Sequence, residues 1–422
     1  MSIKPYPKYK DSGVEWLGMV PEYWEVWRIK HLGTTITGGT PKTDEPDYWI
    51  DGNVPWLPSG KVQNNSIHKE DADTFITKRA LAESAAKLIR PGSALIALTG
   101  ATCANAAFLT FESTANQSVV GIEPKLNADG RFIYYSLLSQ RKQVLTHKSG
   151  GAQGGINQED VRNLVITAPE KAEQSAIASF LDHETAKIDA LIFEQEKLIE
   201  LLKEKRSAVI SHAVTKGLNP DVKMKESGVE WLGMVPEHWE VVPLKRIMAM
   251  QSGETITSES IEDFGDFPVF GGNGFRGYSS EFTHDGDYVL IGRQGALCGN
   301  INYASGKFWA SEHAVVCSPI VPVSILWLGE MLRAMNLNQY SVSAAQPGLS
   351  VEIVANIRTI KPPIKEQEFI ASFLKAELGH IKELTEKNQL TINLLQERRS
   401  ALISAAVTGQ IDVRNFAPYK AA

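Results

Sequence analysis

Two long stretches of the chain alternate apolar and polar residues in the pattern of an amphipathic helix. They span 173–215 and 366–408 and follow Pro169 and Pro362–Pro363, and the first contains no proline or glycine before Gly217. Proline is tolerated ahead of a helix but not inside one, so each stretch predicts one long helix. Steps of four and three residues place mostly apolar side chains on one narrow seam per helix. The predicted seams are Ile177, Leu181, Glu184, Ile188, Leu191, Gln195, Leu198, Leu202, Lys205, Val209 and His212, and Ile370, Leu374, Glu377, Ile381, Leu384, Asn388, Thr391, Leu395, Arg398, Leu402 and Ala405.

The seams predict that the two helices pair with each other as an antiparallel coiled coil. Each seam is long and narrow, which favours mutual pairing over the alternative that each helix packs separately on its own globule. Both seams carry an amide at the same position, Gln195 and Asn388, and such a residue can fix register at some cost in stability. A helix of this length extends about 65 Å at about 1.5 Å per residue, so each helix is also a spacer.

Two regions of mixed pattern, 31–168 and 246–361, precede the helices. Short apolar runs bounded by glycine-rich turns, such as SALIALTG at 93–100 and DYVLIGRQG at 287–295, are typical of buried strands. Strands in the globules and long helices behind them predict an α/β (α+β) fold in which each of two globules is followed by a long helix.

The chain repeats itself. The eleven letters SGVEWLGMVPE occur at 12–22 and again at 227–237, inside a block in which 15 of 20 residues are identical (11–30 and 226–245). The helical stretches repeat as well, but the region between box and helix is 22 residues longer in the first half. The chain is therefore a pseudo-twofold internal repeat of box, variable globule and helix.

A fainter repeat survives inside the globules, where GATCANAAF at 100–108 aligns with GALCGNINY at 295–303. The globules therefore share a fold, while most of their polar residues differ. The predicted division of the chain is a first globular domain at 1–168, a helical spacer at 169–217, a second globular domain at 218–361, a second helical spacer at 362–410 and a tail at 411–422.

Composition narrows the class of protein. The 422 residues allow two or three domains. No apolar stretch is long enough for a transmembrane helix, and the N-terminus MSIKPYPKYK lacks the apolar core of a secretory signal, so we expect a cytoplasmic protein. Cys103, Cys298 and Cys317 form no disulfide framework and have no metal-ligand spacing. The net charge of −6 argues mildly against nucleic acid as a partner.

Motifs that carry chemistry are missing from the sequence. GNGFRG at 272–277 satisfies the glycine pattern of a dinucleotide site, but no amphipathic helix follows it. The sequence has no phosphate-binding lysine loop, no histidine–glutamate metal pair on a helix and no nucleophile elbow. We therefore predict no active site, no metal and no cofactor in this chain.

The pattern as a whole resembles the specificity subunit of a type I restriction–modification system. The resemblance covers nearly the whole chain. It rests on the two SGVEWLGMVPE boxes, on GGTPKTDEPDYWIDGNVPWLPSGKV at 38–62, on FGGNGFRGY and DGDYVLIGRQGALCGNI within 270–301, and on the EQxxIASFL helix starts at 173–181 and 366–374. Order, duplication and local strings agree.

The resemblance implies a subunit that reads an asymmetric, bipartite sequence in double-stranded DNA. Each globule would be a target-recognition domain for one half-site, and the paired helices would set the length of the unread gap. The implied partners are two modification subunits, which use S-adenosylmethionine to methylate adenine N6, and two ATP- and Mg-dependent restriction subunits that can join. We expect weak DNA affinity for this chain alone, since partners can supply much of the positive charge. The alternative is a two-headed protein-interaction scaffold with no role in DNA binding.

Candidate DNA-contacting residues lie mainly in glycine-rich turns, because arginine can pair with guanine, and asparagine or glutamine with adenine. In the second globule they are Asn273, Arg276, Tyr278, Arg293, Gln294 and His313. In the first globule they are Thr99, Thr102, Asn105 and Gln117, and the resemblance to the family adds Lys61. Gln153 and Gln346 lie before the helix starts in both halves, which favours a shared role, either in packing or in phosphate contact, over base choice.

Four tryptophans recur in the boxes, at Trp16, Trp24, Trp231 and Trp239. We interpret them as packing residues. The alternative for them is contact with a modification subunit.

Overall fold

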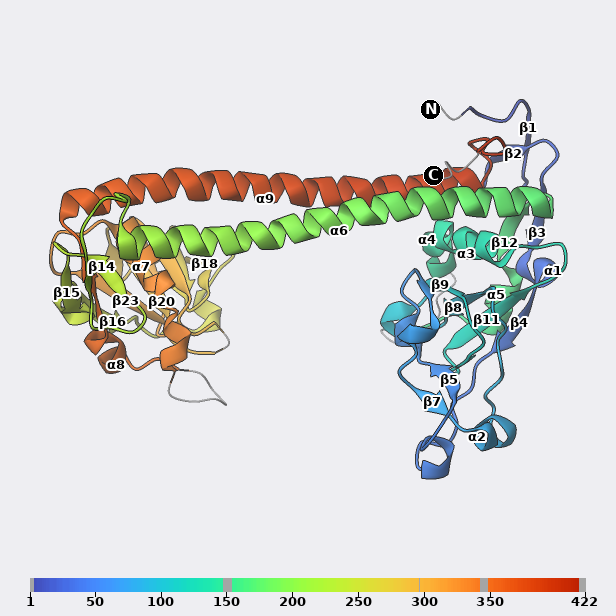
Figure 1. The fold of residues 1–422 in the computed structure, drawn as a ribbon, viewed down its shortest axis with the longest axis horizontal. Coiled ribbons are helices and arrows are strands. Elements are labelled where there is room, and N and C mark those ends of the chain that lie inside the picture. Colours follow the sequence, from blue (N-terminus) through green and yellow to red (C-terminus); the bar gives the residue numbers. More distant parts are fainter. Residues whose placement is uncertain (1–3, 147–153, 296, 342–347, 417–422) are drawn as a thin grey trace. The chain divides into compact units, whose positions relative to one another are not determined.

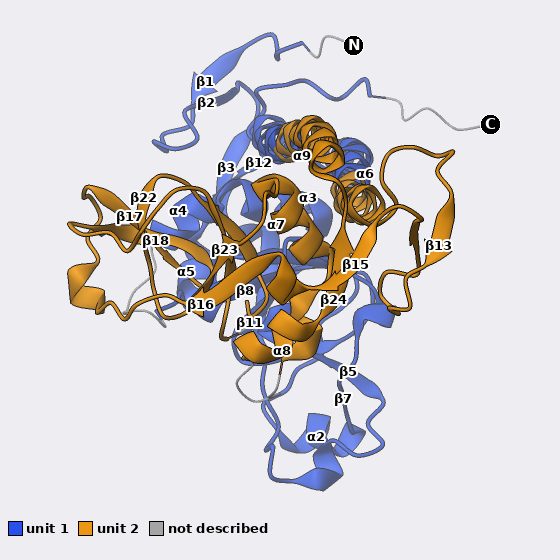
Figure 2. Ribbon diagram, turned by 90° about the vertical axis from the view of Figure 1, so that its left-hand side faces the viewer, with its two compact units in different colours: residues 1–195, 390–422 blue, residues 196–389 orange. Residues whose placement is uncertain are grey.

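The computed structural model describes residues 4–146, 154–295, 297–341 and 348–416 (Figure 1). The chain forms two compact units, residues 1–195 with 390–422, and residues 196–389 (Figure 2). Each unit therefore holds one globule and a part of both long helices. Within the described ranges, the helices are too short or too polar to cross a membrane.

The two long helices are α6, Lys171–Lys216, and α9, Ile364–Val407. In the first unit, Leu181 of α6 and Ile403 of α9 belong to one hydrophobic core. In the second unit, Ile210 of α6 and Leu374 of α9 do the same. In each unit an early part of one helix lies beside a late part of the other (Figure 1), so the predicted antiparallel pairing is confirmed.

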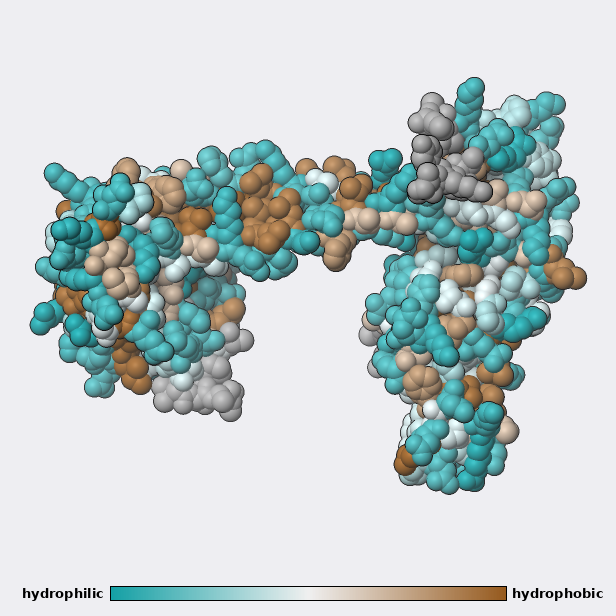
Figure 3. Space-filling model, in the orientation of Figure 1, coloured by the Kyte–Doolittle hydropathy of each residue, from teal (hydrophilic) through white to brown (hydrophobic). Residues whose placement is uncertain are grey.

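The buried stripe of each helix differs from the predicted seam. Leu191 and Leu384 are 51% and 49% exposed, whereas their neighbours Ile192 and Thr385 are half-buried and Ile392 is buried. The α-helix has about 3.6 residues per turn, so a stripe on a nearly straight helix advances faster than the predicted average of about 3.5. Exposed apolar side chains remain along both helices (Figure 3). The predicted seam positions that are exposed are Leu191, Leu198, Lys205, His212, Leu384, Thr391 and Arg398.

The first globule contains a five-stranded sheet of order β4-β11-β8-β9-β6 and a small sheet of order β10-β5-β7. Helix α3 covers the larger sheet on β8, β9 and β11. Its strands are β1 (Tyr9–Asp11), β2 (Met19–Pro21), β3 (Glu25–Arg28), β4 (Gly33–Thr37), β5 (Val54–Leu57), β6 (Asn65–Ile67), β7 (Phe75–Ile76), β8 (Ser93–Ala97), β9 (Ala106–Leu109), β10 (Thr114–Ala115), β11 (Val119–Pro124) and β12 (Val165–Ala168). Its short helices are α1 (Ile29–Leu32), α2 (Lys78–Glu83), α3 (Gly130–Ser139), α4 (Arg141–Thr146) and α5 (Gln158–Asn163).

The second globule repeats this arrangement with a four-stranded sheet of order β16-β23-β20-β21 and a small sheet of order β18-β17-β22-β19. Helix α7 packs on β20 and β21 as α3 packs on β8 and β9. Its strands are β13 (Met224–Glu226), β14 (Met234–Pro236), β15 (Glu240–Pro243), β16 (Met248–Ser252), β17 (Phe267–Gly271), β18 (Gly274–Ser279), β19 (His284–Asp285), β20 (Tyr288–Gly292), β21 (Ile301–Ala304), β22 (Lys307–Ala310), β23 (Ala314–Pro319) and β24 (Arg358–Lys361). Its short helices are α7 (Ile325–Ala334) and α8 (Val351–Asn356).

Residues of the first repeated block contact the start of α6 and the end of α9. Trp24 is fully buried, and its indole N–H donates to the Glu173 carboxylate at the start of α6 (3.2 Å). The hydroxyls of Tyr6 and Tyr23 donate to the same carboxylate, each at 2.9 Å. Gly409, just past the end of α9, lies so close that a Cβ there would be 3.1 Å from the Trp24 ring. The box therefore fixes the start of one helix beside the end of the other.

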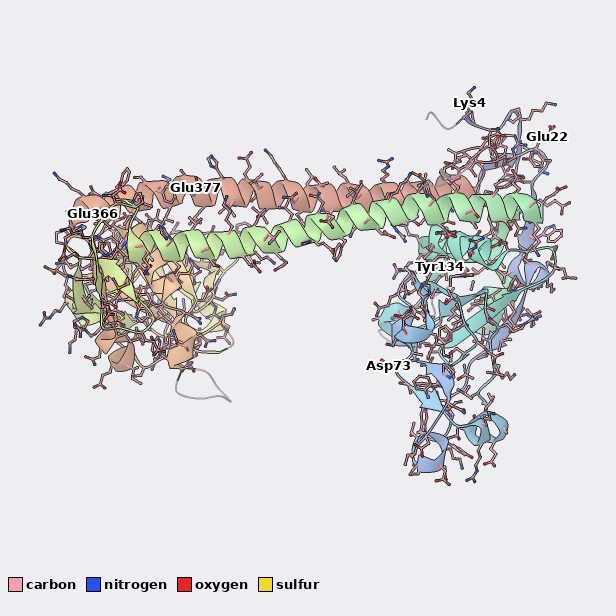
Figure 4. All side chains as sticks on the ribbon, in the orientation of Figure 1. Lys4, Glu22, Asp73, Tyr134, Glu366 and Glu377 are labelled. Carbon is pink, nitrogen blue, oxygen red and sulfur yellow. The ribbon has the colours of Figure 1, made fainter. Side chains whose placement is uncertain are left out.

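The second box does the same with the helices exchanged. The buried Trp239 donates to Glu366 at the start of α9 (2.9 Å; Glu366 is labelled in Figure 4), and His238 lies 2.6 Å from the same carboxylate. A Cβ on Gly217, just past the end of α6, would be 3.2 Å from the Trp239 ring. This repeated clamp accounts for the recurrence of Trp24 as Trp239 in the 20-residue blocks, and the packing interpretation of these two tryptophans is confirmed.

Candidate nucleic-acid interface

In the second globule, the predicted contact residues lie beyond one end of the main sheet. Strand β20 ends at Gly292, opposite the first residue of β23, Ala314. Gln294 follows β20 and His313 precedes β23, so two turns far apart in the sequence lie side by side.

The β17–β18 hairpin lies against the same turns because of two glycines. A Cβ on Gly292 would be 2.4 Å from the carbonyl oxygen of Gly272, and a Cβ on Gly272 would be 2.9 Å from the carbonyl oxygen of His313. Real Cβ atoms do not approach backbone oxygens this closely, so side chains at these positions would push the hairpin away. The glycine-rich sequence thus places Asn273 and Arg276 beside Gln294.

These elements enclose an open pocket of about 390 Å³. Its lining includes four of the predicted residues, Asn273, Arg276, Gln294 and His313, and two that the sequence analysis did not select, Phe275 and Leu297. An apolar residue in a glycine-rich turn gives no sequence signal for a binding role, because it is indistinguishable from a core residue until its exposure is known.

The polar groups of the pocket are available for a ligand. The Arg276 stem lies over Gly271, where a Cβ would be 2.5 Å from the arginine Cδ. Across the described ranges, no acidic side chain forms an ion pair with its guanidinium. His313 Nε2 lies 3.3 Å from Glu312 Oε1, and Asn273 Oδ1 accepts a long hydrogen bond from Asn300 (3.4 Å). Among the described residues, the pocket thus offers a guanidinium with five N–H donors and no ion-pair partner, beside amide and imidazole groups.

Two further candidates of this globule, Tyr278 and Arg293, are half-buried and do not line the pocket. The Tyr278 ring packs 5.1 Å from that of Phe275, and its main chain pairs with Glu262. The Arg293 main chain is bonded to His313 and Leu349. Gln346 lies outside the described residues.

In the first globule, the candidates lie at the corresponding end of the equivalent sheet. Ala97, the last residue of β8, is opposite Val119, the first of β11. Thr99 follows β8 and Gln117 precedes β11, so both lie at this end, and both are exposed. The Thr40 hydroxyl donates to the Gln117 amide oxygen.

Other candidates at this end are held by neighbouring groups. Lys61 Nζ lies 2.8 Å from Asp73 (labelled in Figure 4), and its hydrogen bond lowers the pKa of that carboxyl. The Asn105 amide donates to the Val62 carbonyl (3.2 Å), and its oxygen accepts from the Arg141 guanidinium (3.0 Å), a contact that sequence reasoning missed. The half-buried Thr102 donates to the Thr99 carbonyl at 3.5 Å, and Gln153 lies outside the described residues.

Metal or thiol chemistry has little support in the described ranges. There, no group of three or more His, Cys, Asp and Glu side chains could hold a metal ion. The three cysteines are buried and unpaired, and burial raises the pKa of the Cys298 and Cys317 thiols, which disfavours the reactive thiolate.

A family model and two similar proteins point to the same family. A family model described as "Type I restriction modification DNA specificity domain" matches residues 21–202 and 236–393. The type I restriction enzyme EcoprrI specificity subunit of Escherichia coli is 30% identical over 403 residues, which cover 90% of this chain and 93% of that protein. The MjaVIII specificity subunit of Methanocaldococcus jannaschii is 23% identical over 427 residues, 94% of this chain and 95% of that protein.

Solved structures share the fold at lower identity. A chain from a structure titled "Structural basis underlying complex assembly and conformational transition of the type I R-M system" aligns with a TM-score of 0.68 and 17% identity, over 93% of this chain and 99% of that one. The HsdS subunit from Thermoanaerobacter tengcongensis aligns with a TM-score of 0.51 and 16% identity, over 93% of this chain and 98% of that one.

Proposed function

The chain belongs to the family of type I restriction–modification DNA specificity subunits, and on this premise we propose that each globule reads one half of a bipartite DNA sequence. The family match confirms the resemblance drawn from the repeated boxes, and with it a DNA sequence-specificity role in a restriction–modification complex. The assignment of one half-site to each globule goes beyond the family match and is our proposal.

The observation that carries the proposal is the position of unlike polar residues at the same end of two equivalent sheets. The second globule presents Arg276, Asn273 and Gln294 there, and the first presents Thr99 and Gln117. Arginine can pair bidentately with guanine O6 and N7, asparagine or glutamine with adenine, and threonine with either. A shared scaffold with different groups at its reading end would recognise two different half-sites.

The partners follow from the same premise. A pseudo-twofold chain matches two copies of a modification subunit, and two restriction subunits can complete the complex. S-adenosylmethionine, ATP and Mg would reside in those partners, and this chain would be a non-catalytic recognition subunit. Its net charge of −6 leaves much of the phosphate neutralisation to the partners, so DNA binding by the chain alone should be weak and salt-dependent. Since it acts on DNA, we place it in the cytoplasm.

Methylation mapping of host DNA tests the function directly. A gapped motif should be methylated in the parent strain and lost when the gene for this chain is deleted, provided that the system is expressed. Exchange of residues 31–150 for another such globule should change one half of the motif and leave the other intact. Unchanged methylation after deletion would refute the proposal and favour the protein-interaction scaffold.

A single substitution refines this test. Arg276→Ala should relax the preference at one base pair of one half-site, at a cost of about 1–3 kcal/mol in binding. Arg358→Ala is a matched control in the same unit, since Arg358 is exposed and its guanidinium bonds to the Val241 carbonyl rather than facing the pocket.

A further inference from the structure

The pocket of the second globule exposes two apolar side chains among its polar groups. Phe275 is 56% exposed and Leu297 is 48% exposed, and both line the pocket with Arg276 and Gln294. A large apolar side chain that stays exposed to water does not contribute the free energy that its burial would provide. Two of them in one polar pocket point to an apolar group in the ligand.

Packing holds Phe275 rigidly in its exposed position. Its ring stands edge-on to Phe270 (6.4 Å between centroids) and to Tyr278 (5.1 Å). Phe270 in turn stands edge-on to Phe308 at 5.7 Å, and Phe308 is fully buried. A row of aromatic rings thus connects the exposed ring to the core, so its position is set by the fold.

The major groove of DNA contains one prominent apolar group at its base edges, the C5-methyl of thymine. The same groove presents guanine O6 and N7, which fit an arginine fork. An apolar surface directly beside a free guanidinium therefore matches a thymine next to a guanine. We propose that Phe275 and Leu297 contact the methyl group of a thymine in the second half-site, adjacent to the guanine bound by Arg276.

This inference rests on the proposed DNA-reading function and adds a specific chemical contact to it. The first globule differs at this point, because the residue aligned with Leu297 in the GATCANAAF repeat is the half-buried Thr102, whose hydroxyl is bonded to the Thr99 carbonyl. The apolar pair Phe275 and Leu297 thus belongs to the second globule, and the thymine contact is proposed for its half-site alone.

Uracil substitution isolates the methyl group, because uracil keeps every hydrogen-bonding group of thymine. The complex of this chain with its modification subunits is titrated with duplexes carrying its mapped motif. Each thymine of the second half-site is replaced in turn by uracil. We expect about fourfold weaker binding at one position next to a guanine, the effect of one methyl group removed from an apolar contact. Phe275→Ala should weaken binding to the thymine duplex and abolish its advantage over the uracil duplex.

Phe264→Ala is the matched control, since Phe264 is an exposed phenylalanine of the same unit that does not line the pocket, and it should keep the thymine preference. Leu297→Ala gives a second, independent reading of the methyl contact. Sequence-specific binding that is insensitive to uracil at every position would overturn the inference and leave the function standing. Equal losses on thymine and uracil duplexes with Phe275→Ala would instead show a ring that wedges between base pairs or supports the fold. Absence of sequence-specific binding by the parent complex would refute the function itself.

Discussion

Removal of the Glu173 carboxylate tests the clamp that joins the first box to the helices. Glu173→Ala deprives three donors of their acceptor: the hydroxyls of Tyr6 and Tyr23, and the indole N–H of Trp24. Tyr6 and Trp24 are 2% and 0% exposed, so water cannot replace the lost bonds without rearrangement. Tyr23 is half exposed and can bond to water instead.

The expected loss follows from the number of buried donors left without a partner. Each costs about 1–3 kcal/mol, so Glu173→Ala should destabilise the first unit by about 2–6 kcal/mol. Glu366→Ala, the matched change in the second unit, leaves one buried donor, the Trp239 indole, because His238 is exposed. It should cost about 1–3 kcal/mol.

Hydrogen exchange on the assembled complex separates the two effects. Glu173→Ala should speed exchange at the start of α6 and the end of α9, and Glu366→Ala at the start of α9 and the end of α6. The exposed ion-paired residue Glu200 serves as the control, and Glu200→Ala should change stability by less than about 0.5 kcal/mol. If Glu173→Ala has no larger effect than Glu200→Ala, the carboxylate does not hold the helix end, and the account of the repeated box is wrong.

Three further changes probe the helices and the first core. Ile392→Ala, at a position of the observed buried stripe, should cost about 2–5 kcal/mol in urea unfolding, whereas Leu394→Ala, at a 55% exposed position, should cost less than about 0.5 kcal/mol. Equal costs would contradict the observed stripe. Gly379→Ala should raise stability by about 0.5–1 kcal/mol, because Gly379 lies inside a helix with open space around its Cα; a loss would reveal a contact at this position. Burial raises the pKa of Tyr134 (labelled in Figure 4) from 10.0 to about 12, so the fold favours the neutral phenol. This stabilisation should be complete below pH 10 and lost as the pH rises through about 12, which a pH series of melting temperatures in Tyr134→Phe and parent proteins can measure.

The repeat, the two globules and the long helices could be predicted because they depend on the order of elements and on proline-free apolar periodicity. The set of buried positions along each long helix could not be predicted. Leu191 and Ile192 are adjacent and both apolar, so the pattern fits either residue at the interface. The choice is made by the packing of the helix start, where Ile177 and Leu181 lie in the first core, and by the advance of about 3.6 residues per turn from that point.

The residues at the candidate end of each sheet could be predicted only in part. The glycine-rich turns marked Arg276 and Gln294 as candidates, and the structure places both in one pocket, because close backbone approach needs glycine and such turns expose their polar residues. Phe275 was missed because composition favours a buried phenylalanine. Asn105 shows the opposite case: its amide fits a base-reading role by type, yet both of its polar ends bond within the globule. Residue type specifies what a side chain can bind, and tertiary packing decides what it does bind.

Substitutions of box residues and substitutions of pocket residues should therefore have different effects. Box residues such as Trp24 bond to helix ends and are not among the candidate contact residues, so their loss should weaken the fold without changing the base preference. Arg276 and Phe275 are exposed, so their loss should change the base preference more than it weakens the fold. Gly272 and Gly292 allow the β17–β18 hairpin and the turn after β20 to approach closely through their backbones, and one long hydrogen bond from Asn300 to Asn273 joins them. New side chains can thus be exchanged on these turns while the frame beneath them stays the same, which is the physical requirement for a scaffold that acquires new DNA specificities.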